Sequence, residues 1–234
     1  MKWLLIAVLA TSCAAPLAPA ASLPSAGFTE ARGTLAQATL TRTPSEPLFV
    51  SVVESDRAKG ATWSGLPGFE LVLRGEERVG SRPLFPGQAT FVADGATVDT
   101  AGGSAALFVS LRASSSRGRD LGAGQRSRYA SADLPGSATP AGGYSDALVL
   151  LVMQPGAVIP PHMHGGVEPM YVVEGTIELR VAGRGTKRLG PGDGDTVLPD
   201  TPLLVTNVGS VVARVVVMLA TPDGKPVQTQ TDAP

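Results

Sequence analysis

Histidine, cysteine and aromatic residues are scarce in this sequence. Its 234 residues include two histidines, one cysteine and 5% Phe, Trp and Tyr. A single cysteine forms no internal disulfide, so the stability of the folded chain must come from its packed cores. The two histidines are separated by one residue, which leaves no separate histidine for a Ser-His-Asp triad.

Charge is also scarce and nearly balanced. Charged residues make up 17% of the chain, and the formal net charge is −1. Proteins that bind nucleic acid need a basic excess to neutralise backbone phosphates, so we expect no nucleic-acid partner. Hydrophobic residues reach 43%, which is typical of a globular chain and not of a disordered one.

Long helical patterns are missing beyond the N-terminus, and turn-forming residues take their place. The sequence holds 28 glycines and 20 prolines, spread between short apolar runs. Residues 176–181, TIELRV, alternate polar and apolar side chains as a half-buried strand does, and residues 147–153 and 211–219 are almost continuously apolar. The pattern predicts an all-β fold with many tight connections.

The N-terminus, MKWLLIAVLATSCAAPLAPA, has the features of an export signal. Lys2 is followed by an apolar stretch too short to cross a bilayer by itself, and then by ATSC, which ends at Cys13. This resembles the lipobox of bacterial lipoproteins, which implies a signal peptide over 1–12 and a lipidated Cys13. Cleavage after Ala20, giving a secreted protein, and an uncleaved anchor are the alternatives. In each case we expect the folded part in the cell envelope, facing the periplasm, or outside the cell.

The remaining chain repeats one pattern twice. Three pairs of segments occur in the same order, at offsets of 100, 105 and 108 residues: 71–79 with 171–179, 82–88 with 187–193, and 107–111 with 215–219. Slowly rising offsets are what loop insertions between equivalent strands produce, so we interpret the chain as an internal duplication. The predicted units are a spacer (13–30), a first barrel (31–112), a linker (113–145), a second barrel (146–222) and a C-terminal tail (223–234).

The predicted linker is rich in Ser, Gly, Ala and Pro, as loops are. Four arginines make it locally basic: Arg117, Arg119, Arg126 and Arg128. A solvated loop explains these charges, and contact with anionic lipid headgroups is the alternative. The segment has a third possible position, across the face of one barrel as a lid.

Both histidines lie in residues 156–175, GAVIPPHMHGGVEPMYVVEG. On a strand, His162 and His164 point to the same face, and the two glycines that follow permit a reversal that returns Glu168 beside them. Two imidazoles and a carboxylate form a ligand set for a divalent transition metal such as Fe, Mn, Ni, Cu or Zn. Histidines without any ligand are the alternative.

The same residues resemble the first motif of the cupin superfamily. That motif is a glycine, five residues, H-x-H, three or four residues, a glutamate, six residues and a glycine, and every spacing fits from Gly156 to Gly175. The resemblance implies two tandem double-stranded β-helix (jelly-roll) barrels, with the metal in the mouth of the second. The family's second motif supplies a further histidine, and that position falls at or next to Leu204. Either three ligands hold the metal, with more positions open to water or substrate, or the affinity for metal has decayed.

The first half retains less of the motif. Residues 60–75 contain no histidine, and their one carboxylate, Glu70, is expected to point outward from its strand. We expect this barrel to bind no metal and to pack against the second as an internal pseudo-dimer. The whole protein is then a monomer or a homodimer.

The resemblance implies a small-molecule ligand or substrate, and Met170, Tyr171 and Leu204 are candidates for lining its pocket. A metal-dependent enzyme of dioxygenase or isomerase type is one hypothesis, although the sequence shows no separate general acid or base. The alternatives are a non-catalytic binding lipoprotein and a structural scaffold with a vestigial metal site. The sequence leaves open whether the protein is an enzyme, because cupins have many unrelated activities.

Overall fold

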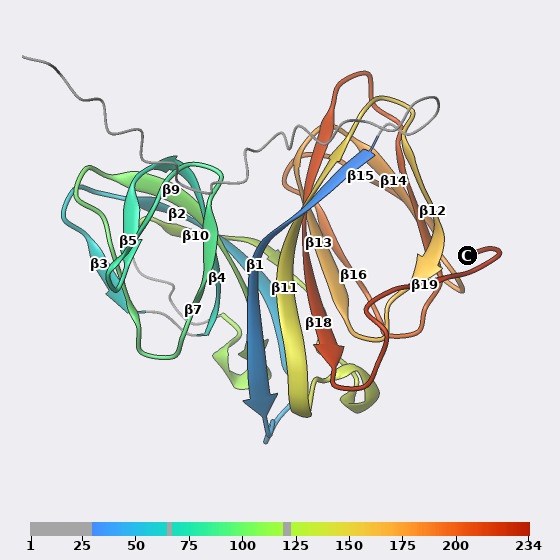
Figure 1. Cartoon of the computed structure of the whole chain (residues 1–234), viewed down its shortest axis with the longest axis horizontal. Coiled ribbons are helices and arrows are strands. Elements are labelled where there is room, and N and C mark those ends of the chain that lie inside the picture. Colours follow the sequence, from blue (N-terminus) through green and yellow to red (C-terminus); the bar gives the residue numbers. More distant parts are fainter. Residues whose placement is uncertain (1–29, 65–66, 119–122) are drawn as a thin grey trace, which may run out of the picture.

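The computed structural model describes residues 30–64, 67–118 and 123–234. The predicted signal peptide and Cys13 lie outside these residues. The described chain is almost entirely β-structure, as predicted, and it forms two barrels that lie side by side (Figure 1). No helix in the described ranges has the length and hydropathy needed to span a membrane.

The second barrel is built from two five-stranded sheets. The first sheet has the spatial order β1 (Glu30–Arg42), β11 (Gly142–Met153), β18 (Ala213–Pro222), β13 (Glu168–Glu174), β16 (Gly194–Val197). The facing sheet has the order β15 (Gly185–Leu189), β14 (Ile177–Val181), β17 (Leu203–Asn207), β12 (Val158–Met163), β19 (Thr229–Gln230). Aliphatic side chains from both sheets pack between them and form the core of this barrel.

The first barrel repeats this plan with shorter strands. Its larger sheet has the order β10 (Gln125–Ala130), β2 (Leu48–Arg57), β9 (Ser104–Ala113), β4 (Gly68–Gly75), β7 (Ala89–Val92). Its smaller sheet has the order β3 (Thr62–Ser64), β8 (Thr97–Asp99), β5 (Glu77–Val79), β6 (Arg82–Leu84). Two single-turn 3₁₀ segments, Ser114–Ser116 and Gly136–Ala138, lie between the barrels in the sequence.

Each barrel contains one strand that the predicted boundaries placed elsewhere, so the barrels exchange strands. β1 was assigned to the first barrel, but it pairs antiparallel with β11 of the second (Figure 1). β10 was assigned to the linker, and it pairs with β2 of the first barrel. A strand's partner depends on long-range pairing, so composition alone could not show either exchange.

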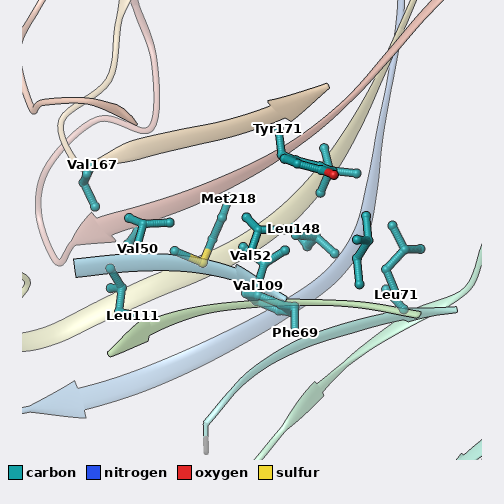
Figure 2. Close-up of a cluster of buried hydrophobic side chains, with 14 of the residues drawn as sticks. Val50, Val52, Phe69, Leu71, Val109, Leu111, Leu148, Val167, Tyr171 and Met218 are labelled. Atoms are coloured by element: carbon teal, nitrogen blue, oxygen red, sulfur yellow. The ribbon is translucent and has the colours of Figure 1, made fainter. Parts of the chain in front are cut away.

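The largest apolar core lies between the barrels (Figure 2). One side comes from β2, β4 and β9, and the other from the sheet that contains β11, β13 and β18. Phe69 and Leu71 on the first side and Leu148 and Met218 on the second are all buried. The predicted internal pseudo-dimer therefore rests on a hydrophobic interface of the size of a barrel core.

Strand registers support the duplication. A β-bulge follows Val72 where β4 pairs with β9, and another follows Val172, 100 residues later, where β13 pairs with β18. Leu71 pairs with Leu107 and Tyr171 pairs with Val216, so the offset of the last strand is 109 residues and not the predicted 108. A shift of one residue in this alignment matters, because it would assign every side chain of the strand to the opposite face of the sheet.

Candidate metal centre

A tight reversal between β12 and β13 brings the predicted ligands together. His162 lies on β12, His164 follows that strand, and Glu168 begins β13. Gly166 passes so close to β18 that a β-carbon would stand 1.9 Å from the Ala220 carbonyl oxygen, so the turn requires glycine. One potential ligand atom from each of the three side chains lies within 4.8 Å of the others.

Backbone carbonyls fix how both imidazoles are oriented. Nδ1 of His162 donates to the carbonyl of Pro160 at 2.8 Å, and Nδ1 of His164 donates to the carbonyl of Val227. A carbonyl only accepts, so each Nδ1 carries the proton and each Nε2 has the lone pair that a metal ion could bind. Metal-binding histidines in proteins are held in the same way, by a hydrogen bond from the nitrogen that does not bind the metal.

Burial controls the charge of the cluster. It lowers the pKa of His164 to about 4 and raises the pKa of Glu168 to about 8. Burial thus disfavours the charged forms of both groups in the 3.5 Å contact between His164 Nε2 and Glu168 Oε2. Oε2 of Glu168 is buried and has no hydrogen-bond partner. Two imidazole lone pairs and an unsatisfied carboxyl oxygen fit a divalent metal ion.

The three side chains line a cavity of about 180 Å³ inside the second barrel. Its walls are mostly aliphatic, and they are formed by Val149, Leu151, Ile159, Val205, Val217 and Leu219. At or next to Leu204, where the resemblance places the further histidine, Val205 lines the cavity and Leu203 lies opposite His162. A metal ion held here would have three protein ligands, and its remaining positions would open onto an apolar cavity.

The three predicted pocket residues do not line this cavity. Met170 is buried in the core of the second barrel, and Tyr171 is buried in the core between the barrels (Figure 2). Leu204 is half-buried and alternates with Val205. Alternation along the strands explains the errors at Tyr171 and Leu204, whose side chains face away from the cavity. Met170 lies opposite the cavity residue Val217 and so faces the barrel interior, but it packs into the core beside the cavity.

Two other features of the site were not foreseen in the sequence. Arg32 on β1 lines the cavity, and its Nη1 donates to Oε1 of Gln228 at 2.9 Å. The predicted C-terminal tail pairs through β19 with β12 and also provides the Val227 carbonyl for His164. Neither segment has a motif of its own, and only the strand exchange and the path of the tail bring them to the metal cavity.

The corresponding space in the first barrel is filled by aromatic rings. Gly68 pairs with Val92 as Glu168 pairs with Val197, so a glycine takes the place of the glutamate. The rings of Phe108 and Trp63 pack edge to face, with centroids 4.9 Å apart. By the same registers, Phe108 corresponds to the cavity residue Val217.

The prediction that Glu70 points outward is wrong, because this residue is fully buried in the first barrel. Nη1 of Arg57 donates to Oε1 of Glu70 at 2.8 Å and also to Glu77, which accepts a second bond from Ser104 at 2.6 Å. In the second barrel the positions of the two glutamates are held by apolar residues, Met170 and Ile177. The first barrel thus has buried charged groups where the second has apolar residues, and aromatic rings where the second has its two imidazoles and carboxyl group.

The fold and the three converging side chains together indicate the family of the protein. Residues 149–219 match the family model of the Cupin domain. The match places this part of the chain in the cupin superfamily, and the two barrels give the whole chain a bicupin fold.

Oxalate decarboxylases are among the solved structures with a similar fold. A study of the Mn(II) centres of the Bacillus subtilis enzyme provides one, with 14% identity, a TM-score of 0.54 and coverage of 92% of this chain and 83% of the other. A deletion mutant of that enzyme has 15% identity, a TM-score of 0.53 and coverage of 80% and 71%. The Lactobacillus farciminis enzyme in complex with formate has 10% identity, a TM-score of 0.54 and coverage of 85% and 88%. No curated protein matches the sequence.

Proposed function

We propose that the second barrel binds a divalent transition metal and presents it to a small organic molecule. Nε2 of His162, Nε2 of His164 and the carboxylate of Glu168 are the ligands. The observation that carries this proposal is the convergence of three potential ligand atoms, one from each imidazole and one from the buried Glu168 carboxyl, within 4.8 Å of one another. A bound metal would supply Lewis-acid or oxygen-activating chemistry at its open positions.

The presence of Arg32 in the cavity lining favours an anionic ligand. Its guanidinium is the single cationic side chain among the described residues that line the cavity, whose other walls are mainly aliphatic. A carboxylate placed between the metal and this arginine would be neutralised from two sides. The similarity to oxalate decarboxylases, one of them with formate bound, is consistent with a small carboxylate, although such low identity supports only the fold.

Binding without turnover is the second candidate function. Apart from the three ligands and Arg32, the described residues that line the cavity carry no titratable side chain. A reaction that needs a separate general acid or base has no residue for that role there. An enzyme of dioxygenase or isomerase type would therefore rely on the metal itself, while a binding lipoprotein would need only the metal and the cavity.

We also propose that the protein is tethered to the cell envelope through a lipid on Cys13 and faces the periplasm. The support for this is the resemblance of the N-terminal sequence to a lipobox. Mass spectrometry of the protein isolated from membranes tests it, because a diacylglycerol on the cysteine changes the mass of the N-terminal peptide. An unmodified cysteine, or a chain that begins after Ala20, would contradict it.

The metal proposal is tested by metal content. The chain without its signal segment is purified, reconstituted separately with Fe, Mn, Ni, Cu and Zn, and desalted before mass spectrometry. We expect about one metal ion per chain in the parent protein and almost none in a His162→Ala/His164→Ala double variant. Glu168→Gln should weaken retention, whereas Glu174→Gln, which changes an exposed carboxylate at the other end of β13, should not. A parent protein that retains none of the metals would overturn the proposal.

A further inference from the structure

A second hollow continues from the metal cavity along β1. Its volume is about 290 Å³, and it shares Thr34, Val149 and Leu219 with the metal cavity. The two hollows therefore meet on the concave face of the sheet formed by β1, β11 and β18. Val227, in the C-terminal segment that holds His164, borders the second hollow as well.

Strand register aligns a row of polar groups in this hollow. On β1, Thr34 lies opposite Val149, Gln37 opposite Ala147, and Thr39 opposite Ser145. Directly opposed residues of an antiparallel pair point to the same face of the sheet, so all three β1 side chains face the hollow. The bulge at the residue after Thr34 makes this possible, because it lets Thr34 and Gln37 share one face although they are three positions apart.

The third strand continues the row. Ser145 on β11 lies opposite Thr221 on β18, and Thr221 also borders the hollow. We call these five side chains the polar groove: Thr34, Gln37, Thr39, Ser145 and Thr221. Except for Thr221, all are exposed, so a ligand would reach them without a rearrangement of the barrel.

The polar groove carries no charge of its own. Asp146 also borders the hollow, but alternation along β11 turns its side chain to the opposite face, where Tyr144 and Leu148 belong to the core between the barrels. The groove therefore offers four hydroxyls and one amide. Each of these groups both donates and accepts hydrogen bonds.

This arrangement favours one chemical class of ligand. An apolar chain would remove water from the five polar groups without replacing their hydrogen bonds, and an anionic chain would find no cation beyond Arg32. A ligand rich in hydroxyl groups can pair with each donor and acceptor in turn. Its acidic end would still lie at Arg32 and the metal, at the start of the groove.

We propose that the polar groove is a subsite for the hydroxylated part of a sugar acid. The carboxylate lies in the metal cavity beside Arg32, and the sugar ring extends along β1 over Thr34, Gln37 and Thr39. This inference rests on the proposed function for the carboxylate end, but the groove itself is formed without the metal. Specificity for the ligand is thus set by a strand that precedes the first barrel in the sequence.

Two ring acids of similar size test the subsite. Glucuronate and cyclohexanecarboxylate both carry one carboxylate on a six-membered ring, but only glucuronate has hydroxyls. With metal-loaded protein, calorimetry should give at least about tenfold tighter binding of glucuronate. A Gln37→Leu/Thr39→Val double variant should lose most of this preference while it retains cyclohexanecarboxylate and the metal. Thr206→Val, on the outer face of β17, should change neither.

A neutral sugar separates this inference from the proposed function. Methyl β-glucoside has no carboxylate, so its binding at millimolar concentration requires the groove and not the metal. We expect NMR shift changes at the amides of Gln37 and Thr39 in metal-free and metal-loaded protein alike. Metal retention without any preference for glucuronate, and without these shifts, would overturn the subsite alone. Failure to retain metal, with the shifts present, would overturn the proposed function alone.

Discussion

A β-carbon on Gly68 would stand 2.7 Å from Cζ of Phe108, so the first barrel has no room for a side chain where Glu168 lies in the second. The same β-carbon would meet the Val109 carbonyl oxygen and the Ser110 β-carbon, each at 2.7 Å. The packing of the first barrel thus excludes a glutamate at this position, because the ring of Phe108 occupies the space.

Gly68→Ala should therefore destabilise the protein, although alanine is a minor change in most strands. We expect a loss of about 1–3 kcal/mol in the free energy of unfolding, because backbone and buried atoms must shift. Gly33→Ala on β1 is the matched control, since a β-carbon there meets nothing within 4 Å. Urea denaturation of both variants checks this. Equal stability of the two variants would contradict the proposed role of Phe108.

The side of β17 that faces the metal can be tested with two adjacent variants. Val205 lines the cavity and Leu204 does not. Val205→His should add a fourth ligand and raise metal affinity by about 10-fold or more, whereas Leu204→His should leave it unchanged. Competition with a chelator of known affinity measures the difference. A stronger effect from Leu204→His would show that β17 has the opposite orientation.

The convergence of the three candidate metal ligands could be predicted from the sequence because they are local. His162, His164 and Glu168 lie within seven residues, and their spacing encodes both the strand alternation and the glycine turn that unite them. The two-barrel fold was also predictable, because the duplication appears as repeated strand patterns. Each of these signals depends on residues that are close in the sequence or at a fixed offset.

The walls of the site could not be predicted, because they depend on long-range pairing. Arg32 reaches the cavity only through the pairing of β1 with β11, and Val227 only through the return of the C-terminal segment. The burial of Glu70 depends on a partner, Arg57, on another strand. Nothing in the local pattern of these residues distinguishes them from surface residues of a strand or tail.

The C-terminal segment should contribute to metal affinity although it provides no ligand. The Val227 carbonyl accepts the hydrogen bond from Nδ1 of His164 and so fixes the orientation of that imidazole. Truncation that removes 226–234 should lower metal affinity by about 10- to 100-fold, as the loss of such a hydrogen bond does in other metal sites. Removal of 232–234 alone retains the carbonyl and β19 and should have little effect. Similar affinities for both truncations would show that the segment does not orient the imidazole.

Stability should fall as pH rises from about 5 to 8, because two buried carboxyl groups away from the metal hold protons in the folded state. Burial raises the pKa of Glu70 from 4.5 to about 8 and that of Asp146 from 3.8 to about 7. The unfolded chain releases these protons near pH 4, so their contribution to stability is complete below that pH. It is lost progressively as pH approaches the folded-state values, by at most about 1.4 kcal/mol per pH unit for each group.

Glu70→Gln and Asp146→Asn should each flatten this pH dependence, because an amide keeps the neutral form at every pH. Glu178→Gln, which changes a carboxyl on the outer face of β14, should leave the slope as it is. Urea denaturation of metal-free protein at several pH values measures the slopes. A stability that rises between pH 5 and 8 would mean that Glu70 is charged in the fold, stabilised by Arg57 more than burial disfavours it.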